Sequence, residues 1–137
     1  MGWDRMKITA DTNVLVRAVV RDDLKQTAAA VSLLQEADLI ALPLPSLCEL
    51  AWALRSVYGF GKTEIATAIE ALLQADNVVV DAPAAKAGLQ FLDAGGDFAD
   101  GVIAYDGRWQ GGETFVSFDK KAVALSVKQG HKARLLG

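Results

Sequence analysis

The stretch Lys7-Ile8-Thr9-Ala10-Asp11-Thr12-Asn13 is the part of this sequence from which a fold can be predicted. A short apolar run ends in an acid, and a segment with the apolar period of a helix, Val14 to Val20, follows at once. This pattern predicts a buried strand that leads directly into a helix, with the Asp11 carboxylate at the C-terminal end of the strand. Ligands of open α/β sheets bind along the edge that such strand ends form. Asp11 is therefore the first candidate for a functional residue.

The rest of the chain repeats the alternation of apolar runs and helical segments. Strands are expected at residues 39–42, 78–80, 114–118 and 133–136. Helices are expected at residues 27–37, 46–58, 62–74, 83–93, 97–109 and 120–128. Strands that alternate with helices favour an α/β fold, in which helices cover both faces of a parallel sheet.

The length and composition are those of one globular domain. A chain of 137 residues, of which 52% are hydrophobic, can bury roughly two thirds of its unfolded surface. We expect a single domain over residues 6–137, with residues 1–5 as an N-terminal extension or a cloning remnant. No apolar run approaches the roughly 20 residues of a membrane span, and the polar start is unlike a signal peptide. These features predict a cytoplasmic protein that does not enter membranes.

Charge and side-chain chemistry narrow the classes of function. A net charge of −3 argues against general phosphate binding by a basic surface. The single cysteine, Cys48, cannot form an internal disulfide, and the single histidine, His131, is interpreted as a loop residue. Zinc therefore has no suitable ligand set. A local phosphate track remains an alternative to an ordinary solvated face, formed by Arg17, Arg108, Lys120, Lys121 and Lys128.

Carboxylates recur where the predicted sheet would bring them to one edge. Two of them directly follow strands and three open helices: Asp11 and Asp119, then Glu49, Asp97 and Asp100. Each could instead cap a helix, and Ser46 with Glu49 has the spacing of a capping box. Crowded carboxylates repel one another, and a divalent cation offsets that repulsion. Oxygen ligands without Cys or His favour Mg²⁺ or Mn²⁺.

A metal held by these acids would constrain the chemistry to metal-activated water attacking a phosphodiester bond. Three short polar residues next to the acids could orient the ligands or the phosphate without binding the metal: Thr12, Asn13 and Ser117. Helix capping and turn formation are the alternative roles for them.

Four segments resemble, in order, the acidic motifs of PIN-domain ribonucleases, and most closely those of VapC-like toxins of type II toxin–antitoxin pairs. The segments are Ala10 to Leu15, Ser46 to Leu50, Asp97 to Ala104 and Val116 to Lys120. The resemblance extends from Met6 nearly to the C-terminus. One departure is Gly101, where alanine is usual, because glycine lowers helix stability.

The resemblance implies a three-layer α/β/α sandwich with a parallel sheet of four to five strands. It also implies that clustered acids hold Mg²⁺ (or Mn²⁺), that the protein is an endoribonuclease, and that it forms homodimers. A cognate antitoxin would inhibit it by binding at the active-site groove. Carried over residue by residue, the catalytic acids are Asp11, Glu49, Asp100 and Asp119, and the metal ligands are Asp11, Asp97, Asp100 and Asp119. Thr12 and Ser117 match polar positions of the first and fourth motifs.

The main alternative from another class is a non-catalytic PIN-fold module that serves dimerisation or antitoxin binding. A haloacid-dehalogenase-type phosphatase would need an acid where this chain has Asn13, and a response-regulator receiver would need adjacent acids after the first strand.

The helical pair over residues 46–74 carries more apolar and aromatic residues than one buried stripe needs, so part of it could form a dimer or antitoxin surface. These residues are Trp52, Leu54, Tyr58, Phe60, Ile65 and Ile69.

Overall fold

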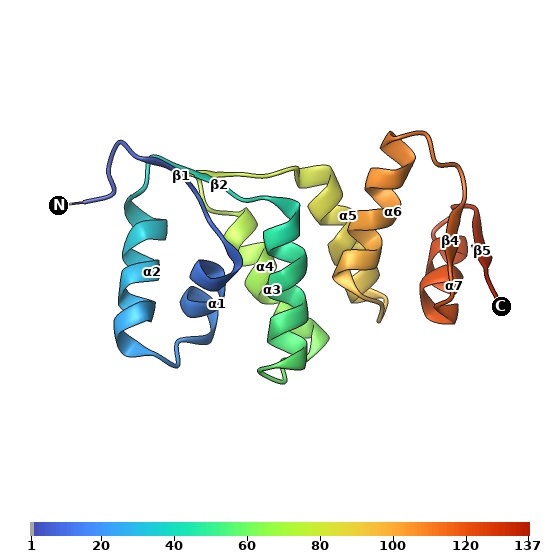
Figure 1. Cartoon of the computed structure of the whole chain (residues 1–137), viewed down its shortest axis with the longest axis horizontal. Coiled ribbons are helices and arrows are strands. Elements are labelled where there is room, and N and C mark those ends of the chain that lie inside the picture. Colours follow the sequence, from blue (N-terminus) through green and yellow to red (C-terminus); the bar gives the residue numbers. More distant parts are fainter. Residues whose placement is uncertain (1) are drawn as a thin grey trace. The chain divides into compact units, whose positions relative to one another are not determined.

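The computed structural model describes residues 2–137 and divides the chain into a first unit, Met1–Ala82, and a second unit, Pro83–Gly137 (Figure 1). Met1, the first residue of the expected extension, lies outside the described residues. The elements of the first unit are β1 (Lys7–Thr9), α1 (Thr12–Val20), α2 (Leu24–Glu36), β2 (Leu39–Ala41), α3 (Leu44–Ser56), α4 (Lys62–Leu73) and β3 (Val78–Val79). Helix α5 (Ala82–Asp93) begins at the boundary, and α6 (Phe98–Trp109), β4 (Phe115–Ser117), α7 (Lys120–Lys128) and β5 (Ala133–Leu135) follow.

All the strand pairs are parallel, which confirms the predicted α/β class. Strand β2 lies between β1 and β3, with Ile8 opposite Ile40 and Ile40 opposite Val78. Strands β4 and β5 form a second sheet, in which Phe115 lies opposite Ala133. One sheet of four to five strands was expected from the sequence, whereas the described strands pair in two sheets of three and two. Each strand has only two or three residues in its ladder, so each sheet rests on few hydrogen bonds.

The core of the first unit is formed by helices α1, α3 and α4 against the strands. Its fully buried side chains include Leu15, Ile40, Leu47, Leu50, Leu54, Ile65 and Ile69. Ala10, which ends the first strand run, donates its N–H to the carbonyl of Ala41 at 3.0 Å and accepts the Ser46 hydroxyl at 3.1 Å. The start of α3 is thereby attached to the end of β1, beside Asp11.

The predicted capping box at Ser46 and Glu49 is wrong. Helix α3 begins earlier, at Leu44, with Pro43 at the N-cap and no side-chain cap bond. Pro45 in the first turn fits this start because proline has no N–H to leave unpaired there. Ser46 and Glu49 therefore lie inside the helix, and Glu49 is free of a capping role.

The second unit is held by close packing of α5 on α6, which run side by side in Figure 1, and by a small apolar cluster. A Cβ atom added at Gly88 of α5 would lie 2.6 Å from the Phe98 ring, and one at Gly101 of α6 would lie 2.8 Å from the Gly88 Cα. Phe91, Ala122 and Leu125 form the cluster, together with half-buried Phe115. The glycine that departs from the usual third motif thus lets the two helices approach.

Two further expectations concern the N-terminus and membranes. The Met6 N–H donates to the Trp3 carbonyl at 3.1 Å, and Trp3 lines a hollow of the first unit together with residues of α1 and α2. Within residues 2–137, every helix is too short or too polar to span a membrane.

Candidate active site

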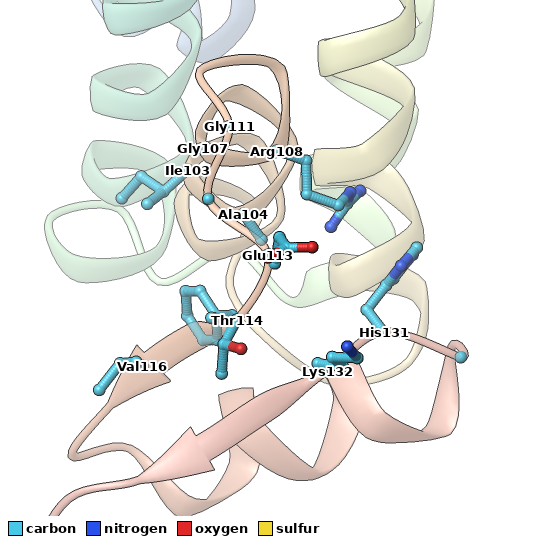
Figure 2. A pocket seen from close by; sticks show the side chains of 13 residues that line it. Ile103, Ala104, Gly107, Arg108, Gly111, Glu113, Thr114, Val116, His131 and Lys132 are labelled. Carbon is cyan, nitrogen blue, oxygen red and sulfur yellow. The ribbon is translucent and has the colours of Figure 1, made fainter.

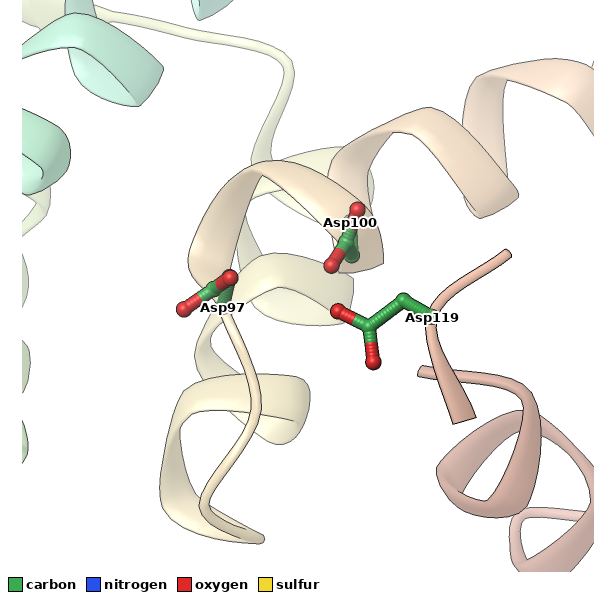
Figure 3. A group of neighbouring side chains, drawn as sticks. All are labelled: Asp97, Asp100 and Asp119. Carbon is green, nitrogen blue, oxygen red and sulfur yellow. The ribbon is translucent and has the colours of Figure 1, made fainter. Parts of the chain in front are cut away.

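Three aspartates of the second unit form a compact cluster (Figure 3). Asp97 is at the N-cap of α6, Asp100 lies in the first turn of that helix, and Asp119 is at the N-cap of α7, just after β4. Each offers a carboxylate oxygen, and these oxygens all lie within 4.8 Å of one another. The strand-end and helix-start positions predicted from the sequence therefore do converge for these three residues.

Asp119 is fixed by the local backbone. Its Oδ1 accepts the N–H groups of Lys121 at 2.9 Å and Ala122 at 3.1 Å. Its own N–H donates to the Ser117 hydroxyl at 3.0 Å. Asp119 is thus a helix cap, as the alternative interpretation had it, and Ser117 forms the turn before it. Capping occupies one oxygen, and Figure 3 shows the Asp119 carboxylate turned toward Asp100.

Asp97 and Asp100 are held differently, because neither carboxylate accepts a hydrogen bond from any residue in the range 2–137. Burial raises the pKa of Asp100 above its ordinary value, and the negative charges of Asp97 and Asp119 raise it further. A carboxylate that is partly desolvated beside two like charges is destabilised in its ionised form. A cation at this point would relieve that destabilisation.

The donor set fits a divalent metal ion. Two oxygens on one Mg²⁺, each about 2.1 Å from it, can be at most about 4.2 Å apart, so small side-chain rotations would complete the site. Carboxylate oxygens without thiol or imidazole partners are the ligands of Mg²⁺ and Mn²⁺. Asp97 and Asp119 are exposed and Asp100 is half-buried, so an ion can reach all three.

The two candidate acids of the first unit each accept a hydrogen bond within that unit. The Asp11 carboxylate accepts the Val14 N–H at 3.2 Å and so caps α1. The Thr12 hydroxyl donates to Oε2 of Glu49 at 2.6 Å, which joins the first and second acidic motifs. Both Asp11 and Glu49 remain exposed. Thr12 was predicted from the sequence to be an orienting residue, but its partner Glu49 was not, because the two are 37 residues apart.

The structure thus brings Asp97, Asp100 and Asp119 together in the second unit, and Thr12 and Glu49 together in the first. Asn13 is exposed and borders the hollow that Trp3 and Asp11 also line.

Arg17 does not suit the phosphate track that the sequence left open as an alternative to a solvated face. Its guanidinium forms an ion pair with Asp22 at 2.6 Å and donates to the Tyr58 hydroxyl at 2.8 Å. These bonds, both within the first unit, already occupy the charged group.

Comparison with known proteins agrees with the geometry. A family model described as the PIN domain matches residues 8–127 of the 137-residue chain, which spans all the acids named above. No curated protein matches the chain.

Proposed function

Because the chain belongs to the PIN domain family, we propose that it is a metal-dependent endoribonuclease, the toxin of a type II toxin–antitoxin pair. Family membership supports nuclease activity in general, RNA as the substrate and the use of divalent metal ions. The observation that carries the finer proposal is the cluster of Asp97, Asp100 and Asp119, whose oxygens lie within 4.8 Å of one another. The proposed ion is Mg²⁺ or Mn²⁺.

In this proposal, Asp100 and Asp119 are the principal metal ligands, Asp97 is an accessory one, and Asp11 contributes from the first motif. When bound, the divalent ion supplies Lewis acidity, which lowers the pKa of water and offsets charge on the phosphate. The protein's own part is to fix the ligands. Asp119 is held by two N–H groups of α7, which leaves Oδ2 free of the capping bonds.

We propose that Glu49 is a catalytic carboxylate that takes part in proton transfer. Its Oε2 accepts the Thr12 hydroxyl, so the carboxylate is held in one orientation while Oε1 stays available. Ser117 positions Asp119 through the turn that precedes α7. Asn13, which is exposed, is available to contact a phosphate oxygen.

We further propose that residues 6–137 act as one domain and that the protein forms homodimers bound by a cognate antitoxin. Of the six apolar and aromatic residues named in the helical pair over residues 46–74, Leu54, Ile65 and Ile69 are buried in the core. Tyr58 and Phe60 are half-buried, and Trp52, which is 66% exposed, is the member of that set most accessible to a partner. Monomers alone in sedimentation at micromolar concentration would contradict the dimer.

The test is cleavage of total cellular RNA by the purified chain, with Mg²⁺ or Mn²⁺ and with EDTA, followed by mapping of new 5′ ends. Total RNA is used because a narrow specificity would escape a single model substrate. Asp100→Asn removes a ligand, and Asp93→Asn, which changes an exposed acid outside the cluster, is its matched control.

We expect discrete new ends that require metal, persist in Asp93→Asn and vanish in Asp100→Asn. Cleavage that survives in Asp100→Asn would overturn the site assignment. A chain that neither cleaves RNA nor binds metal would instead favour the non-catalytic module.

A further inference from the structure

A cavity of the second unit, of about 530 Å³, is lined by charged residues that the proposed nuclease site does not use (Figure 2). It is formed by the last turns of α6, the loop from α6 to β4, and the turn before β5. Arg108, His131 and Lys132 line it, with Glu113 as its one acid. The volume lies within the range of small-ligand sites.

The cavity is distinct from the acidic cluster. Asp100 and Arg108 are eight residues apart on α6, which corresponds to about 12 Å of helix rise. Asp119 follows the end of β4, whereas Thr114, which borders the cavity, precedes its start. The two features therefore lie toward opposite ends of α6 and β4.

Backbone hydrogen bonds build the cavity rim from three segments. The Gly112 N–H donates to the Gly107 carbonyl at 2.8 Å, which folds the loop back onto α6. The Phe115 N–H donates to the Lys132 carbonyl at 3.0 Å, which joins the loop to the turn before β5. The rim is thus preformed, and little ordering would be needed on binding.

The charge of the cavity is opposite to that of the chain as a whole. Arg108 and Lys132 carry two positive charges against one on Glu113, while the chain carries a net −3. Within the described residues, neither cation forms an ion pair; Arg108 only lies over the Tyr105 ring, 5.9 Å from its centroid. The C-terminal end of α6 favours a cation such as Arg108, but it does not account for Lys132, which lies outside any helix.

The cavity has an apolar wall as well as a charged one. Ile103 and Val116, which line it, are 58% and 49% exposed. Figure 2 shows them on one side of the opening, while Arg108, His131 and Lys132 surround the other. A ligand that joins a phosphate to a flat or weakly polar group would match both walls.

We propose that this cavity binds the phosphate of a nucleotide, with Arg108 and Lys132 as the anion-binding groups. Guanidinium and ammonium groups are the side chains best suited to phosphate oxygens. The phosphate belongs either to a free mononucleotide or to a nucleotide within an RNA strand. Binding here does not depend on the metal cluster or on cleavage.

The experiment is calorimetric titration of the full chain in EDTA with adenosine monophosphate and, separately, with a short 2′-O-methyl RNA that resists cleavage. The variants are Arg108→Gln and Lys132→Gln, and Lys86→Gln on α5 is the control with an equal change in charge. We expect at least one probe to bind and each cavity variant to weaken it by about tenfold or more, because a charged hydrogen bond is lost. Lys86→Gln should bind as the unchanged chain does.

The results distinguish a free nucleotide from RNA as the source of the bound phosphate. Binding of the mononucleotide identifies a free nucleotide, and binding of the oligonucleotide alone identifies RNA. Binding of neither probe, or equal weakening in Lys86→Gln, would overturn the proposal. Amide chemical shifts of Gly111, Gly112 and Gly130 in the unchanged chain give a reading that needs no variant, since these residues line the cavity and should respond to a bound probe.

Discussion

The two candidate acids of the first unit, Asp11 and Glu49, accept hydrogen bonds from their own unit, whereas two of the three clustered acids of the second unit accept none from the described residues. Asp11 caps α1 and Glu49 is bound by Thr12. Asp97 and Asp100 lack such donors, and the pKa of Asp100 is raised by burial and then by the neighbouring charges. Hydrogen bonds to a carboxylate stabilise its charge, and crowding destabilises it.

This difference indicates a division of roles between the two sets of acids. An acid already satisfied by the protein gains less from a cation than one whose charge is uncompensated. The cluster of the second unit should therefore dominate metal affinity, while Asp11 and Glu49 adjust position and proton transfer.

The largest expected effect is on metal binding. Asp100→Asn should weaken Mn²⁺ binding by more than about 100-fold, because it removes a direct ligand from a site of three. Glu49→Gln should weaken it by less than about tenfold, since its Oε2 accepts Thr12 in this structure. Calorimetric titration of both variants with Mn²⁺ measures the difference. Equal losses would abolish the distinction between the two sets of acids.

The second prediction concerns the contact between α5 and α6, the helix that carries Asp97 and Asp100 of the aspartate cluster. Gly101→Ala should lower the free energy of unfolding by about 1–3 kcal/mol, because a Cβ there would lie 2.8 Å from the Gly88 Cα. Gly107→Ala on the same helix is the matched control. A Cβ at that position meets nothing within 4 Å, so alanine should raise stability by up to about 1 kcal/mol. Urea unfolding of both variants decides between packing and helix propensity, and a stabilised Gly101→Ala would contradict the packing account.

A third, smaller effect should follow from loss of the bond between the first two motifs. Thr12→Val preserves shape but removes the hydroxyl that donates to Glu49 at 2.6 Å. The rate of RNA cleavage should fall by about tenfold, in the range typical of residues that orient catalytic groups. Thr12→Ser, which keeps the hydroxyl, should retain most of the activity. The same loss in both variants would indicate that the methyl group, not the bond, matters.

The sequence predicted the class of fold and the helix-start positions of four acids because both depend on local pattern. The four acids are Asp11, Asp97, Asp100 and Asp119. The apolar run before Asp11 and the helical period after it are visible within a few residues. The pairing of strands in two sheets was not predictable, since strands of two or three residues leave little pattern from which to assign neighbours. The start of α3 was predicted too late, because Ser46 has the spacing of a cap but donates instead to Ala10, 36 residues away.

The role of Gly101 was also not predictable from the local sequence. Helix propensity alone made it a defect in the third motif. Its close approach to Gly88 becomes visible only when α5 and α6 are packed together. The Thr12–Glu49 bond likewise joins residues that no local window contains. Local chemistry therefore gave the candidates, and tertiary packing determined how each one is held.

The smallest effect is the pH dependence of stability without metal. The pKa of Asp100 in the folded chain is raised above its ordinary value of 3.8, so the native state holds this proton more tightly than the unfolded state. Below the ordinary pKa both states are protonated, and the group has no effect on the free energy of unfolding. As the pH rises through the raised pKa, ionisation costs more in the native state, and stability falls.

Asp100→Asn cannot ionise, so its melting temperature in EDTA should match that of the unchanged chain at low pH and exceed it near neutral pH. The exposed control Asp93→Asn should not acquire this pattern, because it leaves the cluster intact. Mn²⁺ at neutral pH should raise the melting temperature of the unchanged chain but have little effect on Asp100→Asn, since ligand binding stabilises only a native state that can bind. Thermal melts of the unchanged chain and both variants, from low to neutral pH and with or without Mn²⁺, measure these melting temperatures. The opposite result would be an unchanged chain that is more stable at neutral than at low pH, with this gain in stability absent from Asp100→Asn. It would mean that the Asp100 charge is stabilised within the fold, and the contrast between the two sets of acids would be lost.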